Sequence, residues 1–153
     1  MKKAINYVLA YIFWVFDFCL ALLLFFRFRT LILDLLLTLG DPTNWAYTQR
    51  INAIDRFLVV VLGIGWLVFM IVVEEYFRTG VPQGLLLKRF ARITAPVLLI
   101  LFANDLLLVI VQGISKTGWL QWLALVVELG AGIGLLAYNR TQLPSKSLPE
   151  NSR

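Results

Sequence analysis

The chain alternates four long apolar runs with shorter polar segments. The runs cover Ala4–Phe26, Phe57–Val73, Thr94–Gly113 and Trp119–Tyr138. A helix of about 20 mostly apolar residues crosses the roughly 30 Å hydrocarbon core of a bilayer, and every run meets this length or falls a few residues short of it. The pattern therefore predicts an all-α polytopic membrane protein, with four transmembrane helices in one domain over residues 1–140. The polar residues 141–153 are expected to form a disordered tail.

The connection between the first two runs is the longest and has two parts. Residues 31–39 are apolar but too short to cross a bilayer, so they extend the first helix, lie in the interface, or enter the membrane and return. From Trp45 onward, apolar residues recur at helical spacing among polar ones, which predicts an amphipathic segment near the lipid headgroups. Trp45 and Tyr47 fit an interfacial aromatic belt. This segment either anchors the chain or covers a lateral binding cleft.

Composition supports a membrane protein and removes several kinds of chemistry. The residues are 60% hydrophobic and 15% charged, with a mean hydropathy of +0.82, whereas soluble domains are about a quarter charged. There is no histidine, so the commonest general base and metal ligand is missing. The single cysteine, Cys19, is expected to be a packing residue, since one thiol forms no internal disulfide. We expect no enzymatic activity, no metal and no cofactor.

Basic residues gather at the ends of the apolar runs and predict the topology. With the N-terminus inside, nine of the 14 Lys and Arg residues lie in inside segments and five in outside segments. The positive-inside rule then places both termini in the cytoplasm of a multi-pass protein of the cell membrane. Topology also explains the net charge of +5, so nucleic acid is not an expected partner. Four basic residues after the second run either only set topology or contact anionic lipid: Arg78, Lys88, Arg89 and Arg92.

Three acids lie inside the apolar runs, where a charged Asp costs about 2.5–3.5 kcal/mol on insertion scales. They are Asp17, Asp105 and Glu128, and Asn104 precedes the second of them. Counted from the cytoplasmic ends of the predicted spans, their depths are about 20, 17 and 14 Å, which predicts one layer near the midplane without Lys or Arg at that depth. Two interpretations follow. The acids are neutral and donate hydrogen bonds between helices, or they form a proton or cation site.

Small residues indicate where helices meet. Gly63 and Gly65 in the second run, and Gly130 and Gly134 in the fourth, permit close helix packing. Glu128 shares a helix face with Ala124 and Gly132, which places its carboxyl at a helix–helix contact. The contact could lie within one chain, in a homo-oligomer or against another membrane protein.

These features are compatible with three functions. A non-enzymatic accessory or scaffold subunit ranks first, because the sequence carries no catalytic or nucleotide-binding motif. A small proton- or cation-coupled transporter or channel using the mid-membrane carboxylates is the alternative. A lipid-acting enzyme built on Glu74, Glu75 and Asp55 ranks last, because neighbouring helical side chains point about 100° apart and do not easily share one ion.

Overall fold

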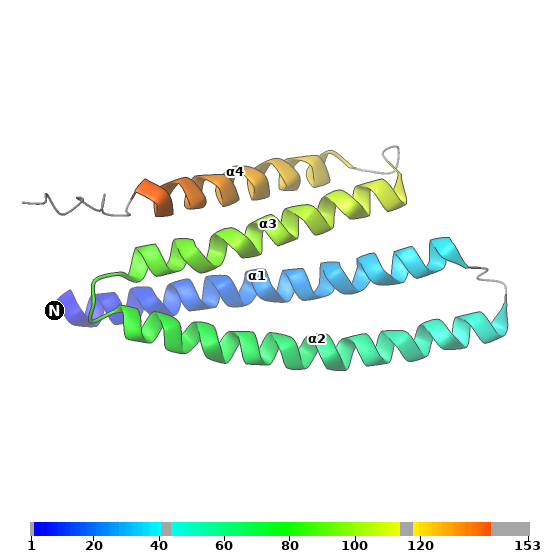
Figure 1. Cartoon of the computed structure of the whole chain (residues 1–153), viewed down its shortest axis with the longest axis horizontal. Coiled ribbons are helices and arrows are strands. Elements are labelled where there is room, and N and C mark those ends of the chain that lie inside the picture. Colours follow the sequence, from blue (N-terminus) through cyan, green and yellow to red (C-terminus); the bar gives the residue numbers. More distant parts are fainter. Residues whose placement is uncertain (1, 41–43, 114–117, 142–153) are drawn as a thin grey trace, which may run out of the picture.

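Four helices joined by short connections make up the part of the chain that the computed structural model describes, residues 2–40, 44–113 and 118–141. No strand occurs in these ranges. Each helix is long and apolar enough to cross a membrane, so the predicted all-α fold with four membrane-spanning helices is confirmed. The helices, labelled in Figure 1, are α1 (Lys2–Leu39), α2 (Trp45–Gly80), α3 (Leu86–Gln112) and α4 (Trp119–Thr141).

The first two helices are much longer than a bilayer core requires. At 1.5 Å per residue, the 38 residues of α1 and the 36 of α2 extend about 57 and 54 Å. Residues 31–39 therefore extend the first helix, which decides among the three alternatives. The amphipathic segment from Trp45 is continuous with the second membrane-crossing helix, and its position in the interface stays a prediction. Thr141, the first residue of the predicted tail, is the last residue of α4. The other residues for which disorder is predicted lie outside the described ranges.

Local contacts fix the hairpin between α1 and α2. Asn44 caps α2, because its side-chain oxygen accepts a hydrogen bond from the backbone N–H of Ala46 at 3.0 Å. The hydroxyl of Tyr47 donates to the backbone carbonyl of Leu36 on α1. Gly40 makes room for this contact, since a Cβ at that position would collide with the ring of Tyr47. The aromatic residue predicted to sit in the interface thus also closes the hairpin.

The helices form an open row in the order α4, α3, α1, α2 (Figure 1). Helix α3 packs against α1 and α4, and α1 also packs against α2. Helix α4 contacts α3 alone among the other helices, and α2 touches α3 less extensively than α1 does. Half of the apolar window of α3 is buried, against 11% to 17% in the other three helices. Helix α3 is therefore the central packing element.

A buried apolar cluster lies where α2 turns into α3. Residues from α1, α2 and α3 build this buried cluster, and Phe13 stacks on Phe90 with 4.3 Å between ring centroids. The cluster consists of Ala10, Val73, Phe77, Val81 and Leu86. The N-terminal end of α1 and the C-terminal end of α4 lie at this same end of the row (Figure 1). An even number of crossings requires this arrangement, whereas the side of the membrane that it faces stays a prediction.

Candidate functional site

Three polar pairs join α1 to α3 along their length. Thr94 donates to Asp17 at 2.8 Å, Arg27 approaches Asp105 at 3.8 Å, and Gln112 donates to Asp34 at 2.7 Å. The partners are 77 or 78 residues apart in each case. A constant offset means that the two helices run parallel and in register. The pairs therefore mark three successive levels of one helix–helix contact.

Asp17 belongs to the first level and is fully buried. Its exposed fraction is 0%, as is that of Thr94, whose hydroxyl donates to Oδ1. The other oxygen, Oδ2, is buried and has no hydrogen-bond partner within the described residues. One carboxyl oxygen is thus satisfied by a neutral donor from α3, which fits a structural contact between two helices.

Asp105 belongs to the second level, and it meets residues from α1 and α4. The exposed fractions of Asn104, Asp105 and Glu128 are 3%, 1% and 7%. Glu128 lies close enough to Asp105 and to Arg27 for both charges to act on its carboxyl. We call these four residues, Arg27, Asn104, Asp105 and Glu128, the three-helix cluster. The prediction that Glu128 sits at a helix–helix contact is confirmed, and the contact is with α3 of the same chain.

The three-helix cluster contains several buried polar atoms whose hydrogen bonds are not made. Four atoms of the cluster are buried and have no hydrogen-bond partner among the described residues: Asn104 Oδ1, Asn104 Nδ2, Asp105 Oδ1 and Glu128 Oε2. Buried polar atoms are nearly always paired in folded proteins, with protein or with bound water. The accumulation of such atoms at one point between three helices makes the three-helix cluster the candidate site.

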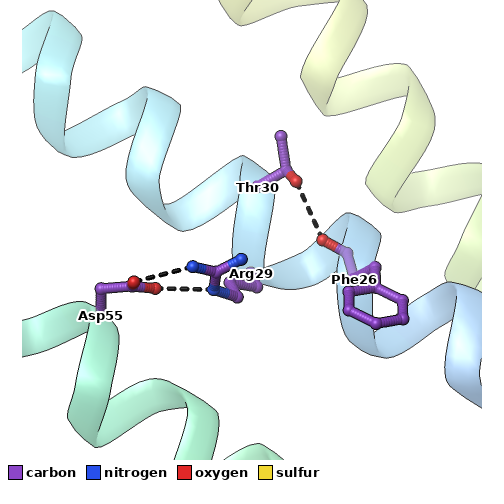
Figure 2. A network of polar contacts seen from close by, with 4 residues as sticks. All are labelled: Phe26, Arg29, Thr30 and Asp55. Carbon is purple, nitrogen blue, oxygen red and sulfur yellow. Dashed lines mark hydrogen bonds and ion pairs between the residues drawn. The ribbon is translucent and has the colours of Figure 1, made fainter.

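A second ion pair extends this level to α2. The guanidinium of Arg29 donates to both carboxyl oxygens of Asp55, at 2.6 and 2.7 Å (Figure 2). Figure 2 also shows Thr30, one residue further along α1, donating to the carbonyl of Phe26 at 2.9 Å. Arg29 lies half a turn from Arg27, so charged groups from all four helices occur at nearly one height of the row.

The expectation that the three acids share one layer is therefore wrong. Ten residues of α1 separate Asp17 from Arg27, which places the two levels about 15 Å apart. The expectation that no Lys or Arg lies at the depth of the acids is also wrong, because Arg27 faces Asp105. Both predictions failed because the predicted ends of the helices differ from the observed ends. Helix α3 begins at Leu86 rather than Thr94, and α1 continues past Arg27 to Leu39.

The four predicted lipid-contact residues lie around the turn between α2 and α3. Arg78 and Arg92 are exposed. Arg89 instead joins the two helices, because it donates to the carbonyl of Tyr76, to Thr79 at 2.6 Å and to Gln83 at 2.7 Å. Its guanidinium also lies 4.7 Å from the ring centre of Tyr76. This role of Arg89 was missed, and a basic residue shortly after a helix end was the available signal. Contact of the four residues with anionic lipid, including Lys88, stays a prediction.

Among the glycines in the apolar runs of α2 and α4, one packs within this chain and four do not. A Cβ on Gly132 would lie 3.0 Å from the side chain of Leu99, so this glycine lets α4 approach α3. A Cβ on any of the four predicted packing glycines would meet nothing within 4 Å: Gly63, Gly65, Gly130 and Gly134. A packing role for these four would therefore have to involve another molecule, and that stays a prediction.

An open apolar groove lies between α1, α2 and α3. Its volume is about 530 Å³, and its lining includes Leu24, Phe28, Gly65, Trp66 and Ile100. The groove lies away from the segment that begins at Trp45, so it is not the lateral cleft considered for that segment. Its lining offers an apolar surface without the charges of the three-helix cluster.

Among the described residues, no group of three or more His, Cys, Asp or Glu side chains is arranged to hold a metal ion. Comparison with protein-family models, with curated proteins and with solved structures finds no match to this chain. The site must therefore be interpreted from its own geometry, in which the three-helix cluster is the main concentration of unpaired buried polar atoms.

Proposed function

We propose that this chain is a non-enzymatic membrane subunit that works in an assembly, as an accessory or scaffold component. The observation that carries the proposal is that, among the described helices, α4 contacts α3 alone, so the row stays open at α4 although α2 also touches α3. Such a row leaves wide apolar faces for neighbours. Its organisation differs from that of four-helix bundles, which enclose a site between all four helices.

The outward face of α4 is the surface on which we base the test. Gly130 and Gly134 are exposed and lie on the side of α4 opposite Glu128 and Gly132, which face α3. Glycines four residues apart let a second helix approach closely in a membrane, where van der Waals packing drives association. We assign this face to contact with another transmembrane helix.

The experiment compares two substitutions to isoleucine in the full chain, isolated with native lipid. Gly134→Ile should reduce the mass of the isolated assembly, because the added side chain holds the neighbouring helix away. Ala103→Ile adds a similar side chain at an exposed position of α3 and is the matched control. A monomeric wild-type chain without associated proteins would overturn the proposal. So would an assembly of unchanged mass in Gly134→Ile.

Proton- or cation-coupled transport is the second candidate, and the buried three-helix cluster favours it. Carboxylates at mid-depth are typical of proton relays and ion pathways. The test is flux into proteoliposomes containing the wild type, Asp105→Asn, Glu128→Gln or the control Asp34→Asn. If transport uses the cluster, Asp105→Asn and Glu128→Gln should lose flux, whereas Asp34→Asn should keep it. Absence of flux in the wild type, or equal flux in all four proteins, would reject this candidate.

A further inference from the structure

The charges around Glu128 do not balance. Helix α4 packs only against α3, where Asp105 is the charged residue facing Glu128, and Arg27 reaches the same place from α1. The other charged residues of α3 and α4 are Lys88, Arg89, Arg92 and Arg140, each about 18 Å or more along its helix from the cluster, and the titratable Tyr138 lies about 15 Å along α4. Arg29 is engaged by Asp55 on the far side of α1. Two carboxyl groups thus share one guanidinium, which leaves one negative charge uncompensated.

The hydrogen bonds are unbalanced in the same direction. In the three-helix cluster, three buried oxygens have no donor within hydrogen-bond distance, namely Asn104 Oδ1, Asp105 Oδ1 and Glu128 Oε2, whereas the cluster's one unpartnered donor group is the amide nitrogen of Asn104. A carboxyl group that takes up a proton becomes a hydrogen-bond donor. One added proton would therefore remove the excess charge and supply a missing donor at the same point.

A proton fits this place better than a larger cation does. The guanidinium of Arg27 lies 3.8 Å from Asp105, so its positive charge would repel a metal ion bound beside that carboxyl. A proton needs no coordination shell, and it is held by a single oxygen with a neighbouring acceptor. The small residue Gly132, one turn from Glu128, allows α4 to come close enough to α3 for such a bond.

We propose that the three-helix cluster binds one exchangeable proton and that Glu128 carries it. The protonated carboxyl donates a hydrogen bond toward α3, and this bond stabilises the packing of α4 against α3. This inference does not depend on assembly or transport. Helix α4 touches only α3, and Glu128 is its buried ionisable side chain. With the proton bound, the contact is neutral and hydrogen-bonded. When the proton leaves as pH rises, Glu128 and Asp105 repel each other, and α4 separates from α3 more readily.

Infrared spectroscopy of the full chain in lipid nanodiscs tests proton binding directly. Because Asp17 is also buried, all samples carry Asp17→Asn, which keeps an oxygen to accept from Thr94. We expect a protonated-carboxyl C=O band that is replaced by a carboxylate band as pH rises. Glu128→Gln should abolish the change, and the control Asp34→Asn should retain it. The same band in Glu128→Gln, or no band at any pH at which the background protein stays folded, would overturn the proposal.

A second measurement tests the attachment of α4. Spin labels at Ile110→Cys and Leu123→Cys, both exposed positions on α3 and α4, report the distance between these helices when Cys19 is replaced by serine. We expect one narrow distance distribution at low pH and a broader one at high pH. Glu128→Gln should stay narrow at both, because its amide is neutral. A label-to-label distance distribution that does not change with pH in the protein that keeps Glu128 would refute the stabilisation of the α3–α4 contact by this proton.

Arg27→Met provides a decisive variant if Glu128→Gln fails to fold. Without the guanidinium, neither carboxyl has a compensating charge, so both should hold protons and the carboxyl band should become larger than in the background protein. A band that is unchanged or weaker in Arg27→Met would contradict the proposed sharing of one guanidinium between two acids.

Discussion

Thr94 and Asp17 illustrate how single polar residues hold two apolar helices in register. Both side chains are fully buried, and the hydroxyl of Thr94 is the donor that satisfies Asp17 Oδ1. Dispersion and burial between Leu, Val and Phe side chains tolerate small sliding movements, whereas a hydrogen bond between two positions does not. The pairs Arg27–Asp105 and Gln112–Asp34 repeat this constraint further along the same helices. The parallel register of α1 and α3 is therefore fixed at three points.

Replacing Thr94 by valine should destabilise the protein more than replacing it by serine. Valine has nearly the same shape but leaves a buried carboxyl without its donor, which costs about 1–3 kcal/mol. Serine keeps the hydroxyl, so its effect should be smaller. Reversible unfolding in mixed micelles of lipid and denaturing detergent measures both variants. Equal stability of Thr94→Val and Thr94→Ser would show that the hydrogen bond to Asp17 does not stabilise the fold.

The Arg29–Asp55 ion pair should show strong coupling between its two members. Removing one partner leaves the other charge uncompensated beside an apolar medium, whereas removing both partners leaves no uncompensated charge. We therefore expect Arg29→Met and Asp55→Leu each to lower the thermal midpoint. The double variant should be more stable than the sum of the two losses implies. Strict additivity of the shifts in thermal midpoint would mean that the two-pronged contact of Figure 2 does not join α1 to α2.

Hydropathy predicted the positions of the helices better than it predicted their lengths. The four apolar runs located the four helices, because apolar length is the dominant signal in a membrane. The helices extend beyond these runs: residues 31–39 continue α1, which was one of three alternatives, and the helical segment predicted from Trp45 is continuous with α2, although charged residues interrupt the apolar character of both. Arg29 and Asp55 neutralise each other across the hairpin, so these charges do not end the helices. Such pairing depends on the neighbouring helix and is not visible in either segment alone.

The candidate site was predicted in part for a related reason. Asp105, Asn104 and Glu128 were identified by charge or polarity within apolar runs, and the structure brings them together. Asp17 is predicted to lie in the same place and lies elsewhere, while Arg27, which follows the end predicted for the first span at Phe26, lies in the cluster. Helix rotation and register decide both outcomes, and a single sequence contains no direct information about them.

Gly132 should be the glycine of α4 that controls its packing on α3. Gly132→Ile places a bulky side chain against Leu99, where even a Cβ would be only 3.0 Å away, and overpacking of this kind costs about 1–3 kcal/mol. We expect fluorescence transfer between labels on α3 and α4 to decrease. Gly134→Ile is the control for this contact, because nothing in the same chain lies within 4 Å of its Cβ. Equal decreases in the two variants would contradict the assigned orientation of α4.

At the scale of the whole molecule, the row of helices is polarised in charge. Lys88, Arg89 and Arg92 lie near the start of α3, and Arg140 lies near the end of α4, at the same end of the row (Figure 1). The opposite end had seemed to carry a competing group of basic residues. Two of them, Arg27 and Arg29, pair with carboxyl groups inside the helical row and do not belong to a loop.

This asymmetry leads to a topology that can be measured on intact cells. The positive-inside rule counts Lys and Arg in short loops, so the α2–α3 turn should face the cytoplasm and the α1–α2 hairpin the other side. In a chain with Cys19→Ser, an impermeant maleimide should label Gln49→Cys from outside and Gln83→Cys only after permeabilisation, since both positions are exposed. Labelling in the reverse order would place the basic end outside. It would also mean that another factor, such as a partner subunit bound to the row, sets the orientation during insertion.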